Sequence, residues 1–238
     1  DDPLIQAWQK LFPQLFESIE SMPSILKAHL LVPEDFFNVQ VSQLQRYHVE
    51  DPRIFYSGDD VWQVPQELYG TTQIPVAPYH ITAQLKRSLD SEFLLLQPLT
   101  PLARPNLSGL LAARSDADHY GELVLMRFPS DVPIFGPEQV QALINQNPTI
   151  SQQFGLWDRA GSQVVQGNLL VVPLGNALLY VEPIYLRARR GGLPTLTRVV
   201  VSNGSRVVMA DDLSTGLEVL FQGSASKDGL VQDLEKVS

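Results

Sequence analysis

The sequence predicts an α+β fold, with a mixed, largely antiparallel sheet, flanking helices and an N-terminal helical extension. Three observations support this. Residues 3–44 have helical hydrophobic spacing, the period changes to strand type from about residue 79, and one amphipathic helix pattern returns at 211–221. No tandem repeat is apparent. We therefore expect a helical extension over 1–46, an α+β core domain over 47–222, and a last region, 223–238, that is a linker with the start of a truncated helix or an engineered tail.

Composition limits the function. The chain has 238 residues, of which 44% are hydrophobic and 18% charged, as in an ordinary globular protein. The net charge of -9 argues against nucleic acid, which needs a local excess of Lys and Arg. The absence of cysteine excludes disulfides, thiolate catalysis and cysteine-bound zinc. No apolar run reaches the roughly 18 residues of a membrane span.

The N-terminal extension begins with Asp2 as a helix cap and Pro3 in the first turn. Pro13 and Pro23 should divide the helix that follows. Its apolar residues have the spacing of one helix face, which must cover either the sheet of this domain or a partner: Leu4, Ile5, Trp8, Leu11, Phe12, Leu15, Phe16 and Ile19. A second short helix is expected over 33–44, where Glu34 and Asp35 suit its N-terminus.

The middle of the chain predicts a hairpin of strands 79–85 and 92–96, followed by a proline-rich loop over 98–106. We expect a short helix over 107–114, a strand over 121–128 and a helix over 137–145.

The last third predicts four strands and a closing helix. Strands 164–172 and 177–186 have continuous apolar runs, which favour a position buried on both faces near the middle of the sheet. Strands 196–202 and 206–209 are joined through Asn203-Gly204, a strong hairpin signal. Gly167-Asn168 and Glu182-Pro183 are as consistent with β-bulges or strand ends as with contacts to a ligand.

Residues Leu217–Gly223 have two interpretations. They spell the recognition sequence of a picornaviral 3C protease, which is used in engineered proteins. The engineered site continues with Pro, however, whereas Ser224 follows here. Leu213, Leu217, Leu220 and Phe221 also complete one helical face that begins at the Asp211-Asp212 cap. We favour native sequence.

The loop that contains Arg104 and Asn106 is the strongest candidate binding site. Arg104 could hold a carboxylate or phosphate, with a helix N-terminus after Asn106 adding amide groups. The simpler interpretation, which we favour, pairs Arg104 with an internal carboxylate such as Glu122 or Glu182 and makes Asn106 a helix cap.

Asp59 and Asp60 form a second candidate binding site, because paired carboxylates can do acid–base chemistry on a sugar. Neighbouring residues in one loop do not supply the required separation across a cleft, so a turn and helix cap is favoured. Asp116, Asp118 and His119 could supply metal ligands, but a polar loop is favoured since a metal site needs further ligands. His48 and His80 lack the partners of a general base. We expect no catalytic residue, no metal and no cofactor.

Several ordered motifs resemble one family. They run from Tyr47-x-Val49-x-Asp51-Pro52 and Asp60-x-Trp62-x-Val64-Pro65, through Phe93–Leu96, Pro98-x-Thr100-Pro101 and Arg104–Leu107, to Phe135-Gly136-Pro137 and the block from Pro148 to Leu186. The chain resembles an uncharacterised family of large bacterial membrane proteins, found in actinobacteria, cyanobacteria and some clostridia. Its members have N-terminal membrane spans followed by a large extracytoplasmic region.

This resemblance implies location rather than activity. The chain would be the C-terminal part of that extracytoplasmic region, held at the cell membrane by its own transmembrane region. We expect a non-catalytic module that binds a protein or envelope component, with self-association left open. The alternative is a cell-envelope hydrolase that uses carboxylates of the Asp51–Asp60 region with His119 or Arg104.

Overall fold

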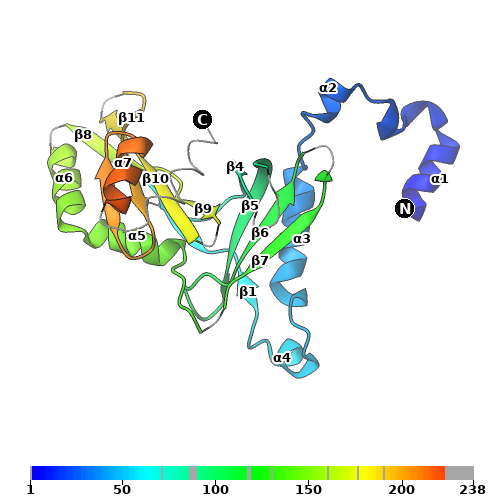
Figure 1. Cartoon of the computed structure of the whole chain (residues 1–238), viewed down its shortest axis with the longest axis horizontal. Helices are drawn as coiled ribbons and strands as arrows, with labels where there is room; N and C mark the ends of the chain where they lie inside the picture. The colour runs from blue at the N-terminus through cyan, green and yellow to red at the C-terminus, as the bar shows by residue number, and fades with distance from the viewer. Residues whose placement is uncertain are drawn as a thin grey trace.

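The computed structural model describes residues 2–70, 72–85, 90–116, 119–129, 131–159, 161–175, 177–189 and 191–222. Two five-stranded antiparallel sheets and one separate hairpin make up the body, and helices pack against them (Figure 1). The predicted α+β class, with a largely antiparallel sheet and flanking helices, is confirmed, although the strands are divided between two main sheets rather than one.

An N-terminal arm, residues 2–31, projects away from this body (Figure 1). It consists of α1 (Pro3–Leu11), η1 (Pro13–Leu15), η2 (Ile19–Ser21) and α2 (Ser24–Lys27). Asp2 caps α1 as expected, accepting a 2.7 Å hydrogen bond from the amide of Leu4. None of the residues in these four helices is buried.

The first sheet is built on the long strand β5 (Glu92–Pro101). β6 (Gly109–Arg114) and then β7 (Leu123–Arg127) follow on one side, and β4 (Tyr79–Ala83) and β1 (Trp62–Gln63) share the other edge. α3 (Glu34–Tyr47), the helix expected after Pro33, packs Phe37 and Val41 against one face. α4 (Pro52–Ser57) precedes β1.

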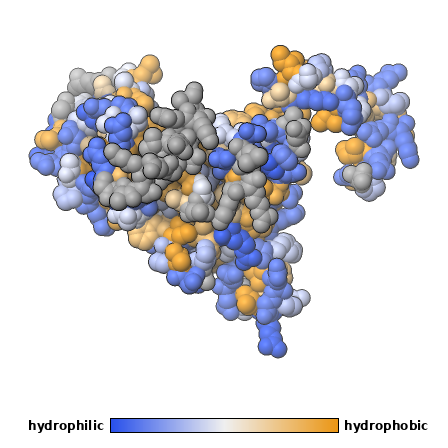
Figure 2. All heavy atoms as spheres, in the orientation of Figure 1, coloured by the Kyte–Doolittle hydropathy of each residue, from blue (hydrophilic) through white to orange (hydrophobic). Residues whose placement is uncertain are grey.

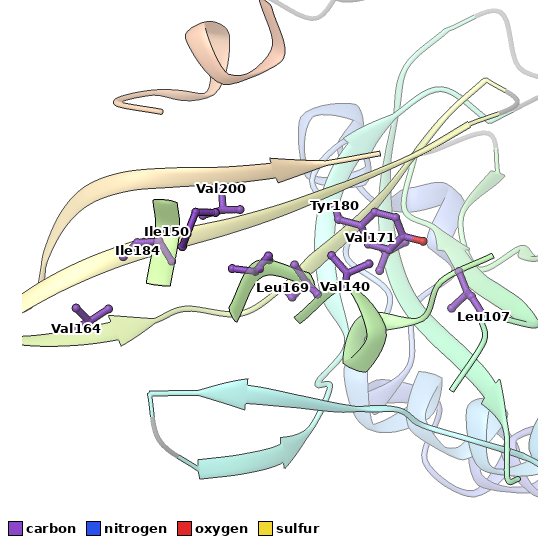
Figure 3. Close-up of a cluster of buried hydrophobic side chains, with 10 residues drawn as sticks. Leu107, Val140, Ile150, Val164, Leu169, Val171, Tyr180, Ile184 and Val200 are labelled. Atoms are coloured by element: carbon purple, nitrogen blue, oxygen red, sulfur yellow. The ribbon is translucent and has the colours of Figure 1, made fainter. Parts of the chain in front are cut away.

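The second sheet is built on β10 (Ala177–Ala188). β11 (Thr195–Ser202) and β12 (Val207–Ala210) lie on one side, and β9 (Leu170–Leu174) and β8 (Ser162–Gln166) share the other edge. α5 (Pro137–Gln146) and α6 (Pro148–Arg159) cover one face, where Val140 and Ile150 meet Tyr180 and Ile184 (Figure 3). α7 (Leu213–Phe221) covers the other through Leu217 and Leu220.

The two sheets repeat one strand arrangement. In the first sheet, the first half of β5 pairs with β4 and its end pairs with β1. In the second sheet, the first half of β10 pairs with β9 and its second half pairs with β8. Leu96 lies opposite Tyr79 in the first sheet, and Val181 lies opposite Leu170 in the second. The next residues are Gln97-Pro98 and Glu182-Pro183, so the break between the edge strands falls at the same place. This repetition was not visible in the sequence, because few side chains are shared at matching positions.

Three predicted elements were wrong, wholly or in part. Residues 107–114 are not a helix: Gly109–Arg114 is strand β6, in the middle of the first sheet. Leu110 and Ala112 are buried on one face and Leu111 and Ala113 on the other, so packing overrides the helix propensity of Leu and Ala. Predicted strand 164–172 is broken into β8 and β9 around residues 167–169, and both lie at an edge of the second sheet rather than in its middle. The first residues of the predicted loop 98–106 belong to β5, which continues to Pro101.

Other predictions were confirmed. β4 pairs with β5 as the expected hairpin, and β11 pairs with β12 through the turn that contains Gly204, whose φ is 87°. α7 begins after Asp212, which accepts from Thr215 N. Because Leu217 and Leu220 are buried against the second sheet, this segment is an integral part of the fold.

Candidate functional site

A cleft of roughly 960 Å³ lies between the two sheets. One wall comes from β7 and the segment after it, and the other from the β9–β10 and β11–β12 turns. Apolar residues gather between the two lobes on this face (Figure 2). The apolar side chains of the lining include Met126, Phe128, Ile134, Leu174, Leu178 and Phe221. Among the described residues of the lining, Arg127 is the one charged side chain, and no Asp, Glu or His takes part.

Specific contacts hold the cleft wall formed by residues 131–136. Tyr180 of β10 donates its hydroxyl hydrogen bond to the Phe135 carbonyl at 2.5 Å, which attaches this wall to the second sheet. Leu107 N donates to the Ile134 carbonyl at 2.8 Å, which attaches it to the first. Gly136 lies so close to Pro105 that an added Cβ would be 2.1 Å from the Pro105 carbonyl oxygen. The wall therefore bridges the two sheets.

Arg104 and Asn106 lie in the loop beside this wall. Asn106 forms an isolated β-bridge with Phe135, and its amide donates a long 3.5 Å hydrogen bond to Ile134. It does not cap a helix, because β6 follows instead. Arg104 is exposed, and neither internal pairing expected for it occurs: Glu122 pairs with Arg114, and Glu182 bonds with Gln166.

Asp59 and Asp60 lie in the turn after α4. Asp59 accepts a 2.6 Å bond from the hydroxyl of Ser57, as a turn residue does. Asp60 lies 3.5 Å from His48 Nε2, and the other ring nitrogen of His48 is 2.9 Å from the Leu44 carbonyl oxygen. The His48 ring also stacks on Trp62 at 3.7 Å. Nδ1 is thus bonded to main chain, whereas Nε2 is buried and makes no hydrogen bond. Neither nitrogen of this buried ring is open to a substrate.

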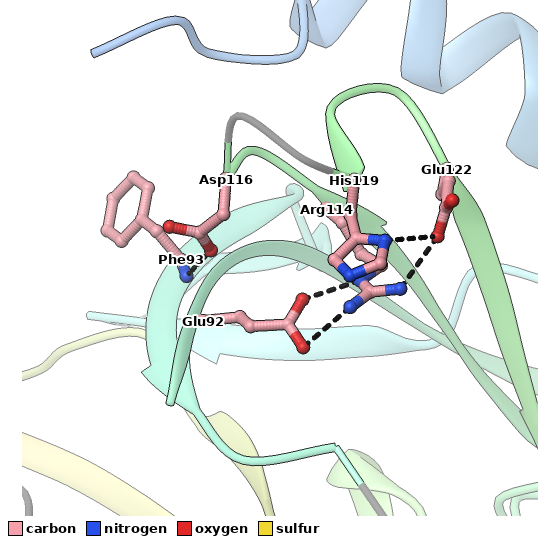
Figure 4. A network of polar contacts seen from close by, with 6 residues as sticks. All are labelled: Glu92, Phe93, Arg114, Asp116, His119 and Glu122. Carbon is pink, nitrogen blue, oxygen red and sulfur yellow. Dashed lines mark hydrogen bonds and ion pairs between the residues drawn. The ribbon is translucent and has the colours of Figure 1, made fainter. Parts of the chain in front are cut away.

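His119 belongs to a different network (Figure 4). Arg114 at the end of β6 binds both carboxylate oxygens of Glu92 and donates to Glu122 at 2.6 Å. His119 Nδ1 is 3.2 Å from the same oxygen of Glu122, and hydrogen bonds from His119 and Arg114 lower the pKa of Glu122. Asp116 accepts from Phe93 N at 2.8 Å. Asp118, its predicted companion, lies outside the described residues.

The structure brings some of the predicted residues together and separates others. Leu102 N donates to the Val61 carbonyl at 2.8 Å, so the Asp60 segment and the Arg104 loop meet at one end of the first sheet. His119 lies at the other end, because Gly109 pairs with Leu99 while Arg114 pairs with Leu94. In the part of the chain that the structure describes, no three His, Asp or Glu side chains are arranged to hold a metal ion.

Two buried carboxyl groups, Glu67 and Glu182, were not singled out as titratable sites by the sequence. Glu67, on the hairpin of β2 (Gln66–Tyr69) and β3 (Thr72–Pro75), accepts from Asn168 Nδ2 at 2.7 Å and from Leu169 N at 2.9 Å. Its burial raises its pKa. Burial also raises the pKa of Glu182, to about 8. The sequence did contain one sign of a buried carboxyl group, because Glu182 is a single acid inside the apolar run of residues 177–186.

The fold and cleft define an α+β module with two similarly connected sheets and an apolar cleft, without a convergent catalytic group among the described residues. No described helix is long and apolar enough to cross a membrane. The profile of the Uncharacterised protein family (UPF0182) matches residues 1–157. The chain belongs to this family.

Relatives in cyanobacteria support this assignment. The chain is 83% identical over 238 residues, its whole length, to a UPF0182 protein of Synechococcus sp. (strain CC9311), of which it covers 26%. It is 76% identical over 226 residues (95% of the chain) to a protein of Prochlorococcus marinus (strain MIT 9303), covering 24% of that protein. A protein of Trichodesmium erythraeum (strain IMS101) is 51% identical over 93% of the chain, which covers 22% of it. The chain thus spans about a quarter of the length of these relatives. No solved structure matches it.

Proposed function

We propose that this chain is a non-catalytic, extracytoplasmic binding module of a larger multi-pass membrane protein. The observation that carries the binding role is the composition of the cleft, where apolar side chains from both sheets meet without an acid, a base or a histidine in the described lining. Such a surface buries apolar area and, in its described part, offers no carboxyl or imidazole group for acid–base chemistry. The ligand class that fits it is an apolar segment of a partner protein.

The predicted residues supply a polar neighbour to this surface. The loop that carries Arg104 and Asn106 is bonded to the cleft wall at Ile134 and Phe135. Arg104 is exposed and suited to a carboxylate on the partner. Asp60 and Asp59, at the same end of the first sheet, would favour basic groups there. In this proposal the cleft supplies affinity and the loop supplies orientation.

The alternative, an envelope hydrolase, has less support. Asp59 and Asp60 lie at the same end of the first sheet as the Arg104 loop, but Asp60 faces His48 and Asp59 bonds with Ser57. His119 lies at the opposite end of the sheet. Hydrolysis of a glycosidic bond by carboxyl groups needs two of them, one on each side of that bond. No described cleft brings these side chains into that arrangement.

The location is tested by labelling the full-length protein in intact cells. The cysteine-free sequence of this chain allows Tyr56→Cys, at a side chain that is 87% exposed, to be read on its own peptide by mass spectrometry. A membrane-impermeant maleimide should label this peptide in intact cells. Labelling that requires lysis would place the module in the cytoplasm and refute the proposal.

The binding surface is tested by purifying the full-length protein with its partners from native membranes. Ala177→Asp puts a charge on an exposed residue of the cleft lining, and Leu193→Asp is the control on an exposed residue elsewhere. We expect Ala177→Asp to lose the partner, Arg104→Ala to weaken its recovery and Leu193→Asp to retain it. A partner set that is the same in all three variants would remove this surface from consideration.

A further inference from the structure

The N-terminal arm has an apolar face that nothing in the described structure covers. Trp8 stacks on Phe12 with ring centroids 5.4 Å apart, yet the two side chains stay 53% and 45% exposed. Leu4 and Leu11 belong to the same helix, α1, and are 69% and 70% exposed. Leu15, in η1 just after this helix, is 76% exposed. Orange residues stand among polar ones along the projecting arm in Figure 2. Apolar surface of this extent on a helix and the turn that follows it is typical of a contact site.

The arm is attached firmly at its base. Tyr120 donates a 3.2 Å hydrogen bond to the Leu31 carbonyl, and Val32, the next residue, is buried with Phe37 and Val41. The end of the arm that joins the body is therefore fixed, and the rest of the arm projects away from the first sheet (Figure 1). It does not fold back to complete the core of the body.

The charge of the arm argues against a membrane surface as its occupant. Helices that lie on membranes usually have Lys and Arg on their polar face. Residues 1–31 contain four acids, Asp1, Asp2, Glu17 and Glu20, against two lysines, Lys10 and Lys27. Anionic headgroups would repel this segment, whereas an apolar protein groove would accept it.

The rest of the full-length polypeptide is the partner that we expect to cover the apolar face of the arm. The chain covers 26% and 24% of two close relatives, so about three quarters of such a polypeptide lies outside it. The family profile also includes the arm, since it matches from residue 1. We propose that the apolar face of the arm packs into an apolar groove on the remaining part of the same polypeptide and fixes this module to it. This inference rests on family membership and is independent of the cleft.

Cross-linking in the full-length protein tests this assignment. A photoreactive benzophenone amino acid replaces Leu15 on the arm, and in a matched control it replaces Leu193, which is 88% exposed on another part of the chain. After irradiation in native membranes, mass spectrometry identifies the cross-linked peptide. We expect position 15 to link to a peptide of the same polypeptide outside this region, at a yield about tenfold above position 193.

Each other outcome overturns the proposal. Mixing copies with two isotope labels distinguishes links within one chain from links between chains, so a mixed-isotope product would identify a second copy as the occupant. A lipid adduct would identify the membrane surface. Equal, unspecific products at positions 15 and 193 would show that the arm does not pack into a groove. Trp8→Asp, on the exposed arm, should abolish the specific link, while circular dichroism of the variant stays unchanged.

Discussion

Gln97 in the first sheet and Glu182 in the second occupy the same position of the repeated strand arrangement. Gln97 comes directly after Leu96, the last residue of β5 that pairs with β4, and Glu182 comes directly after Val181, the last residue of β10 that pairs with β9. A proline follows each of them. Both side chains are buried, at 1% and 0% exposure. Gln97 donates to the carbonyls of Val76 and Pro98 at 3.1 and 3.3 Å, whereas Glu182 accepts a 3.4 Å bond from Gln166. An amide and a carboxyl group thus fill the same break in two sheets.

Glu182→Gln should change how stability depends on pH. The pKa of Glu182 is about 8 in the folded chain, against an ordinary 4.5, so the folded state holds a proton that the unfolded state releases. This contribution is complete below about pH 4.5 and is lost as pH rises toward about 8, by about 1.4 kcal/mol for each pH unit. In urea unfolding, the variant should resemble the wild type at pH 5 and exceed it at pH 8. Gln97→Glu should introduce a similar loss in the first sheet. A difference between wild type and Glu182→Gln that is constant with pH would contradict the assignment.

Tyr79→Phe should loosen the contact between the sheets. The Tyr79 hydroxyl donates to the Val171 carbonyl at 2.9 Å and accepts from Val171 N at 3.0 Å, which joins β4 to β9. The variant leaves two buried main-chain groups without a partner, at a cost of about 1–3 kcal/mol. Thermal unfolding measures this loss. Tyr56→Phe, at an exposed site, should leave the midpoint unchanged, and equal effects of the two variants would refute the role of Tyr79.

Arg114→Met should be among the most destabilising changes in the first sheet. It leaves the buried carboxylate of Glu92 without its bidentate partner, and removal of one member of a buried ion pair costs about 3–5 kcal/mol. Glu122→Gln should cost little, because the Glu122 side chain is half exposed. Denaturant midpoints compare the two. The double variant Arg114→Met/Glu92→Gln should recover part of the loss, and failure to recover any would show that the charge of Glu92 is not the cause.

Gly136→Ala should disturb the cleft wall. Its Cβ would lie 2.1 Å from the Pro105 carbonyl oxygen, so main chain must shift, at a cost of about 1–3 kcal/mol. Gly155→Ala is a matched control within α6, where an added Cβ meets nothing within 4 Å. Ala there should stabilise the helix by about 0.5–1 kcal/mol. Calorimetric midpoints should therefore move in opposite directions, and a shift in the same direction would contradict the close contact.

Local signals predicted much of the fold, and long-range pairing decided the rest. Asp2, Asp212 and Asn203-Gly204 carry their structure in adjacent residues, and the caps and hairpin follow them. Ala112 and Ala113 favour a helix locally but form a strand, because β5 and β7 occupy both sides of β6. The segments that carry Arg104 and Asp60 come together only through the pairing of distant strands. The cleft could not be predicted, since its two walls are about fifty residues apart in the chain and depend on how the sheets dock.

The β2–β3 hairpin makes the two sheets dependent on each other. It is inserted in the first repeat, between β1 and β4, but its bonds go to the second: Gly70 N donates to the Gln166 carbonyl, Gln66 N bonds with Glu138, and Glu67 receives Asn168 and Leu169. A piece containing either sheet alone would expose one half of these contacts to water. We therefore expect the two sheets to fold and unfold together as one cooperative unit, although each has a complete set of five connected strands.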